Sequence, residues 1–292
     1  MIKLEDYNIL KKIVSVGMGD VYLAEHKVLE TKVAIKSLYA NLVGFLLVLF
    51  LFPLTMYSQS NLPYKVGEYS AFDISFGGIK VGSADLEIVR QIQVNGTSTF
   101  HIIGKAKTAS FFDWFFKVRD VYETYLDTSK VLPVRFVRDI NEGGYKKKQL
   151  YNFNHSDGLV FWENTSHIIY PNSQDMLSSL FFARTFKKGS LMQEKSFFVP
   201  IFMDEENYLL EILYLYNEKV TTNFGEVNCM VFKPKMQEGR VFEDGEKMKI
   251  WISDDKNCLL VKVETQIWAG TINVILVKYQ GLKYPLSINK DF

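Results

Sequence analysis

Residues 69–90 read YSAFDISFGGIKVGSADLEIVR, and this stretch decides the fold of most of the chain. Apolar and polar residues alternate on both sides of Gly77-Gly78, and a period of two is typical of strands with one buried face. Paired glycines supply the positive φ angles that a tight hairpin turn needs. The stretch therefore predicts two antiparallel strands that are joined at Gly77-Gly78.

Similar segments continue to the end of the chain, at a spacing of about 10 to 12 residues and with turn residues between them. Strands are predicted at residues 97–106, 118–127, 132–140, 147–154, 165–170, 196–204, 208–217, 226–235, 248–254, 259–268 and 271–282. This pattern predicts an all-β fold, a curved antiparallel sheet in the form of a sandwich or an open barrel. The aromatic content of 15% favours strands as well.

One helix interrupts the strands at residues 173–185. Ser173 is its predicted N-cap, and Asp175 lies in the first turn, where a negative charge is favourable. Apolar residues at helical spacing mark one face, namely Met176, Leu177, Leu180 and Phe181. We expect this short helix to cover one side of the curved sheet.

Composition and motifs exclude several classes of function. The 34 basic and 33 acidic residues nearly balance, so a nucleic-acid partner is not predicted. Cys229 and Cys258 are too few and too far apart for paired zinc ligands, although a disulfide between them is allowed. The sequence has no G-x-S-x-G and no H-E-x-x-H motif, so we predict no catalytic residue, cofactor or metal site.

An apolar run at residues 42–56 precedes the predicted sheet, and no charged residue lies between Lys36 and Lys65. The run is short for a bilayer span but fits the apolar part of an export signal. Pro53 breaks its helix, and the small Ser58 and Ser60 after it offer places for cleavage. Two alternatives remain, an uncleaved anchor in the inner membrane and a buried core helix. No cysteine lies near the end of the run, so lipid attachment is not predicted.

Residues 6–38 resemble the first three strands of bacterial Ser/Thr protein kinases. The segment VAIK ends with Lys36 at the position of the family's phosphate-binding lysine, and Gly17 and Gly19 match the end of the glycine-rich loop. Val14 and Val16 replace the first two loop glycines, and the H-R-D, D-F-G and A-P-E motifs are missing from the chain. The resemblance implies ATP binding through Gly17, Gly19 and Lys36 only if this fragment belongs to the native protein.

Residues 66–285 resemble a family of bacterial envelope proteins, domain of unknown function 3108, and in particular its Bacteroidota members. Four segments in the same order carry the resemblance: GEYSAFDISFGGIKVGSADLEI, GKAKTASFFDWFFKVRDVYETYLD, LPVRFVRDINEGGYKKK and QDMLSSLFFART. It implies an exported, β-rich protein, and it supplies no site residues. The chain is thus expected to comprise a kinase-like fragment at 1–38, a signal or anchor at 39–60 and an exported β domain at 61–292.

Two clusters are candidate ligand-binding sites. Arg138 and Glu142, beside the predicted turn at Gly143-Gly144, either bind a polar ligand at the rim of the barrel or take part in cross-strand ion pairs. Trp114 belongs to the aromatic block SFFDWFF at residues 110–116, which is either a core element or an exposed patch that contacts a ligand or a membrane.

Three hypotheses for function follow. The first is a non-enzymatic protein, exported to the periplasm or cell envelope, that binds an apolar, lipid-like or polymeric ligand. The second is a nucleotide-binding protein or phosphotransferase, which the missing kinase motifs oppose. The third is a periplasmic enzyme with a site on loops that the sequence does not mark.

Overall fold

The computed structural model describes residues 7–16, 19–26, 32–38, 62–186, 189, 193–236, 248–267 and 270–289. The chain divides into two compact units, Met1–Tyr57 and Ser58–Phe292. The predicted signal or anchor at 39–60 lies outside the described residues, so its role stays a prediction. Among the helices that are described, none is long and apolar enough to cross a membrane.

The first unit contains a three-stranded antiparallel sheet, with β1 (Tyr7–Val16), β2 (Gly19–His26) and β3 (Lys32–Leu38) in that order. The arrangement does not test ATP binding, which stays a prediction.

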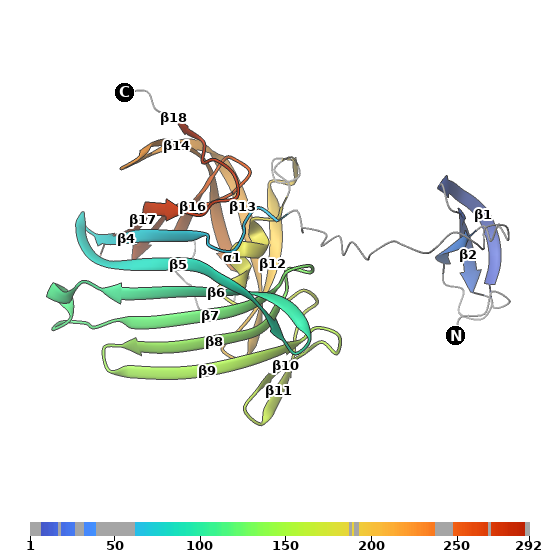
Figure 1. Cartoon of the computed structure of the whole chain (residues 1–292), viewed down its shortest axis with the longest axis horizontal. Helices are drawn as coiled ribbons and strands as arrows, with labels where there is room; N and C mark the ends of the chain where they lie inside the picture. The colour runs from blue at the N-terminus through green and yellow to red at the C-terminus, as the bar shows by residue number, and fades with distance from the viewer. Residues whose placement is uncertain are drawn as a thin grey trace, which may run out of the picture. The chain divides into compact units, whose positions relative to one another are not determined.

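The second unit is all-β, as predicted, and its strands form one antiparallel sheet with an open path (Figure 1). Along this path the order is β11-β10-β9-β8-β7-β6-β5-β4-β17-β16-β15-β14-β13-β12, and β18 adds to β14. The strands are β4 (Tyr69–Phe76), β5 (Ile79–Val94), β6 (Thr97–Thr108), β7 (Arg119–Asp127), β8 (Pro133–Glu142), β9 (Tyr145–Asn154), β10 (Leu159–Trp162), β11 (Thr165–Ile168), β12 (Ser196–Met203), β13 (Glu206–Thr222), β14 (Gly225–Met236), β15 (Met248–Ser253), β16 (Leu260–Ile267), β17 (Gly270–Gln280) and β18 (Ile288–Asn289).

The predicted hairpin is present, with Phe76 paired to Ile79 across the turn. Gly77 and Gly78 have φ angles of 56° and 84°, which a residue with a side chain rarely adopts. The strand that follows, β5, is longer than an average strand and contains a bulge between Ile88 and Arg90. Bulges increase the local twist, and the twist helps this long sheet to curl.

The curl brings the two edge strands of the sheet toward each other. Gln174 bridges to Ile201 of β12 in parallel, with its N–H donating to the Pro200 carbonyl at 2.8 Å. Asn207, next to the β12–β13 turn, donates through Nδ2 to the carbonyl of Ile168 in β11 at 2.7 Å. The segment that follows β11 therefore links the two edges.

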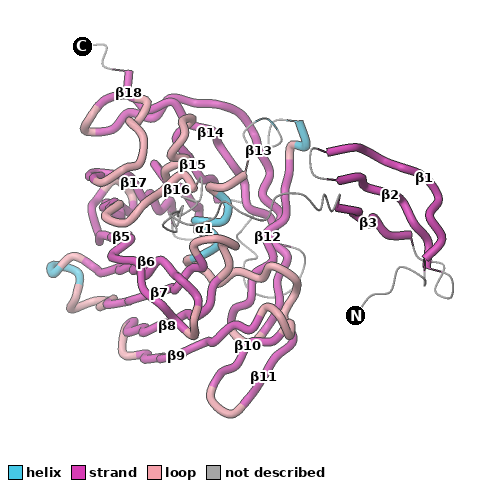
Figure 2. Tube along the Cα trace, turned by 45° about the vertical axis from the view of Figure 1, so that its right-hand side comes forward, coloured by secondary structure: helices cyan, strands magenta, loops and turns pink. Residues whose placement is uncertain are grey.

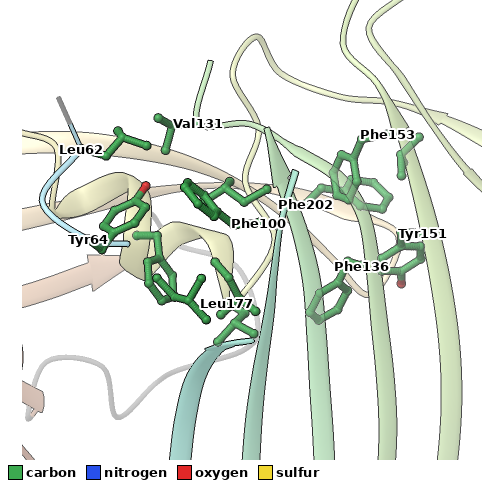
Figure 3. Close-up of a cluster of buried hydrophobic side chains, with 14 of the residues drawn as sticks. Leu62, Tyr64, Phe100, Val131, Phe136, Tyr151, Phe153, Leu177 and Phe202 are labelled. Carbon is green, nitrogen blue, oxygen red and sulfur yellow. The ribbon is translucent and has the colours of Figure 1, made fainter. Parts of the chain in front are cut away.

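The helix α1 (Ser178–Ala183) lies against the concave face of the sheet (Figure 1). Phe181 of the helix and Leu177, which precedes it, join a buried cluster with Tyr64 and Phe100. Figure 3 shows Leu177, Tyr64 and Phe100 of this cluster together with rings from the neighbouring strands. Phe136, Tyr151, Phe153 and Phe202 extend this cluster across β8, β9 and β12. The prediction of a short covering helix is confirmed.

The predicted start of the helix is wrong, because α1 begins at Ser178 and not near Ser173. Gln174 is held extended by its bridge to β12, so the helix cannot begin before it. Asp175 acts as the cap instead, since its carboxylate accepts from the backbone N–H groups of Leu177 at 2.8 Å and Ser178 at 2.7 Å. In return, Ser178 Oγ accepts from the Asp175 N–H at 2.8 Å.

Candidate ligand-binding site

An apolar cavity of about 110 Å³ lies between α1 and strands β12 to β15, and we call it the chamber. Leu180 and Ala183 of α1 form one wall, and the strands supply the other with Phe197, Ile212, Phe232 and Ile252. Ser179 and Arg184 are the polar members of the lining. A cavity of this character offers few polar groups to keep water in place, and it is suited to an apolar ligand.

A second, open cavity of about 590 Å³ adjoins the chamber, and we call it the vestibule. The two cavities are adjacent, because both are lined by Arg184, Phe186 and Cys258. The vestibule is also lined by charged and polar groups, including Asp254, Asp255, Lys256 and Tyr284. The two cavities together offer an apolar interior next to a polar, open mouth.

Arg184 is held at the boundary between the two cavities by a buried ion pair. Its Nη1 and Nη2 atoms lie 2.5 Å and 3.1 Å from the two carboxylate oxygens of Glu68, and Nε donates to the Asn257 carbonyl at 2.9 Å. The guanidinium also stacks on the rings of Tyr64 and Phe181. These contacts satisfy the buried charge and fix the end of α1.

Asp175 fixes the other end of α1. Its carboxylate is fully buried and accepts from Thr124 Oγ1 of β7 at 2.6 Å. Burial raises the pKa of Asp175 to about 6, against the hydrogen bonds from Thr124, Ser178 and Leu177, which favour the charged form. The helix is therefore attached to the sheet at both of its ends.

The predicted pair Arg138 and Glu142 lies away from the chamber. Arg138 is buried, as strand alternation predicts relative to the exposed Asp139, and it contacts Gln149 and Asp204. Burial raises the pKa of Asp204, but the hydrogen bonds and positive charges of Lys147 and Arg138 outweigh burial and hold this pKa below its usual range. Burial, with a hydrogen bond to Asp120, raises the pKa of Glu142. Arg138 thus has its ion pair with the β12–β13 turn, and binding of a ligand by Arg138 and Glu142 stays a prediction.

Trp114 lies in the connection between β6 and β7, which projects from one end of the sheet in Figure 2. Phe111, Trp114, Phe115 and Phe116 are exposed, and we call these four residues the aromatic lip. The alternative of a core element for this block is therefore wrong. The lip is no part of the chamber lining, so a role of Trp114 in ligand binding stays a prediction.

The predicted ATP-binding residues fall partly outside the described structure. Gly17 is not described, Gly19 begins β2, and Lys36 lies in β3 opposite Val21. This backbone pairing does not test nucleotide binding, which stays a prediction.

Both cysteines are thiols that belong to different packing clusters. Cys229 packs with Val227 and Val231, whereas Cys258 packs with Met230 and Phe232 next to the chamber. The disulfide that the sequence allows is therefore not formed. Within the described residues, no group of three or more His, Cys, Asp or Glu side chains could hold a metal ion.

Comparison with known families is decisive for the second unit. The family Protein of unknown function (DUF3108) matches residues 71–277, which is more than half of the chain. The chain belongs to the DUF3108 family. The resemblance that the four sequence segments indicated is thus confirmed, and the match does not include the kinase-like residues 6–38.

Other comparisons add little to membership of DUF3108. No curated protein matches the chain. A β-barrel-like protein with a domain of unknown function (DUF1849) from Brucella abortus is similar at 12% identity and a TM-score of 0.49, over 75% of this chain and 99% of that chain. A candidate lipoprotein from Parabacteroides distasonis is similar at 11% identity and a TM-score of 0.35, over 76% of this chain and 99% of that chain. Likenesses at this level indicate nothing about ligand or activity.

Sequence reasoning missed the residues of the chamber in this DUF3108 protein. Leu210 and Ile212 lie in the predicted strand YLLEILYLYN, where nearly every residue is apolar, so the sequence does not mark which side of the strand faces the chamber. What the sequence does not show is that four strands and a helix converge on one space. The apolar face of residues 176–181 is the nearest available signal, since it marks a helix that must face something apolar.

Proposed function

We propose that this DUF3108 protein is a non-enzymatic protein of the bacterial cell envelope that binds a lipid-like molecule. The end of the ligand's apolar part would occupy the chamber, which has room for only a few methylene groups, and the rest of the ligand would lie in the vestibule near Lys256 and Tyr284. The apolar lining of the chamber is the observation that carries this proposal. Export is supported by the apolar run at 42–56, which resembles a secretory signal.

A lipid-like ligand fits this site better than a polymeric one. The chamber is small, and its walls offer few hydrogen-bonding groups, whereas a polar polymer would need many of them. The adjoining vestibule is wide and contains charges of both signs, so it can accept a polar head group.

Binding of the fluorescent fatty acid cis-parinaric acid to the full chain tests the proposal. Ile212→Trp places an indole in the chamber, and we expect it to raise the dissociation constant by about tenfold or more. Leu215→Trp is the matched control, because Leu215 lies on the same strand with an exposed side chain, and it should bind as the wild type does.

Any binding to residues 42–56 is common to both variants, so the difference between the variants reports on the chamber alone. Equal affinities of Ile212→Trp and Leu215→Trp, or no binding by the wild type, would contradict the proposal. Circular dichroism of both variants shows whether each one is folded as the wild type is.

A further inference from the structure

The aromatic lip exposes an unusual amount of apolar surface for a loop. Phe111 is 76% exposed, Trp114 81% and Phe115 78%. Burial of such side chains is strongly favourable, and a group of them in water usually marks a surface that contacts another apolar phase.

The exposure of the lip is built into its local structure. Asp113 lies between the aromatic residues, and its carboxylate is held by Arg119, with Nη2 to Oδ2 at 2.6 Å and Nη1 to Oδ1 at 3.0 Å. Thr108 Oγ1 donates to the same carboxylate at 2.7 Å. Because the polar residue is tied inward toward β6 and β7, the neighbouring rings are directed away from the sheet.

The lip also packs against the neighbouring hairpin. The Gly143 N–H donates to the Lys117 carbonyl at 2.9 Å. A Cβ atom at Gly143 would lie 2.4 Å from the ring of Phe116, so only glycine allows this close approach. The lip is therefore supported by the β8–β9 turn and does not stand alone.

Further exposed apolar residues lie at the same end of the sheet. The turns β4–β5, β6–β7 and β8–β9 share one end, because successive antiparallel strands reverse direction. Ile79, at the β4–β5 turn, is 63% exposed, and Tyr145, at the β8–β9 turn, is 58% exposed. Together with the lip, they give this end of the sheet an apolar tip.

Positive charge surrounds this tip. Between Lys105 and Arg119 the chain has four basic residues and one acidic residue, Asp113, which Arg119 engages. Lys107, Lys117 and Lys146 are exposed beside the aromatic residues. Of the nearby acids, Asp139 pairs with Lys148 at 3.4 Å, whereas Glu142 and Asp120 contact each other and share the negative charge of one site.

We propose that the aromatic lip docks on the surface of a membrane that contains anionic lipids. Tryptophan and phenylalanine are suited to the boundary between head groups and acyl chains, and lysines beside them are attracted to anionic head groups. An acidic protein surface would suit the lysines alone, but it would leave three highly exposed rings without an apolar phase. This inference rests on the lip alone and is independent of the chamber.

Fluorescence of Trp114 in the full chain tests this docking directly. The emission of Trp114 is obtained as the difference between the spectra of the wild type and Trp114→Phe. Both proteins are measured with vesicles of equal parts phosphatidylglycerol and phosphatidylcholine, once with ordinary and once with brominated acyl chains. We expect a shift to shorter wavelength and at least about twofold quenching by brominated lipid, because the ring reaches the acyl boundary. The same difference for Trp162→Phe is the control, since Trp162 packs against the core and should not be quenched.

Replacing Lys117 and Lys146 with Gln should reduce the quenching of Trp114 by about twofold or more, because each lysine adds attraction to anionic lipid. Vesicles of phosphatidylcholine alone should give little quenching. The readout is local to the lip, so it remains valid if residues 42–56 also hold the chain on the vesicle. Unquenched Trp114 on protein that floats with anionic vesicles, equal quenching in neutral vesicles, or a blue shift that depends only on protein concentration would each overturn the proposal.

Discussion

The two sides of α1 differ in how completely they are packed. On one side, Leu177 and Phe181 are buried, and the ring of Phe181 meets the edge of Tyr64 at 5.0 Å. On the other side, Leu180 and Ala183 face the chamber. Protein interiors are normally close-packed, so a void beside a well-packed helix needs a reason.

The attachments of α1 provide that reason. Asp175 binds Thr124 at the start of the helix, and Arg184 binds Glu68 at its end. A helix that is fixed at both ends and packed along one side does not need contacts on its second side to stay in place. The comparison teaches that the void is maintained by polar anchors, and space kept in this way is available to a ligand.

Two phenylalanines of β12 give the strongest test of this difference. Phe202 is 1% exposed and touches the rings of Tyr151 and Phe153, whereas Phe197 is half-buried and lines the chamber. Phe202→Ala should lower the free energy of unfolding by about 3 to 5 kcal/mol, and Phe197→Ala by about 1 to 2 kcal/mol, because part of the Phe197 ring already faces empty space. Urea unfolding measures both.

Equal losses for the two variants would mean that the chamber closes around Phe197 in solution. The two positions share residue type and strand, so differences in β propensity cancel in the comparison.

Local features of this fold are readable from the sequence, and distant ones are not. The Gly77-Gly78 hairpin and the strand at 208–217 were predictable because turn chemistry and strand composition are local. The start of α1 was not, because Gln174 pairs with β12, a contact that no local rule contains. The anchor between Glu68 and Arg184 joins residues 116 positions apart and is equally invisible.

The aromatic block at residues 110–116 also shows that tertiary contacts cannot be read from local sequence. A run of rings around Trp114 favours a core element by its composition, and this alternative failed. The orientation of the rings depends on the ion pair of Asp113 with Arg119 and on the β8–β9 turn. Composition identified the residues of interest, and tertiary contacts decided whether their side chains are buried or exposed.

The buried anchor Asp175 gives a smaller effect that depends on pH. Its pKa is about 6 in the folded protein, raised by burial from 3.8. Between these values the folded state keeps a proton that the unfolded state releases, so the stability contributed by Asp175 falls as the pH rises through this window. Above about pH 6, the buried ionised carboxylate of Asp175 should lower the free energy of unfolding by about 3 kcal/mol.

Asp175→Asn cannot ionise, so the unfolding free energy of this variant relative to wild type should improve by up to about 3 kcal/mol between pH 4 and pH 7. Other carboxylates contribute equally to both proteins and cancel. Asp139→Asn, at an exposed position of β8, is the control and should show no such change. A flat difference for Asp175→Asn would indicate that water reaches the carboxylate and that this end of α1 is less firmly buried.

The smallest expected effect is a gain in stability from filling the chamber. Ala183 lies on the hollow side of α1, and leucine has nearly the same helix propensity as alanine. Ala183→Leu should therefore raise the free energy of unfolding by about 1 kcal/mol, because its added methylenes enter empty apolar space. A loss of about 1 to 3 kcal/mol, measured by the same urea unfolding, is the result expected for a packed position. Such a loss would show that both sides of α1 are packed in solution. A gain together with weaker binding of cis-parinaric acid would show that the added side chain and the fatty acid compete for the same space.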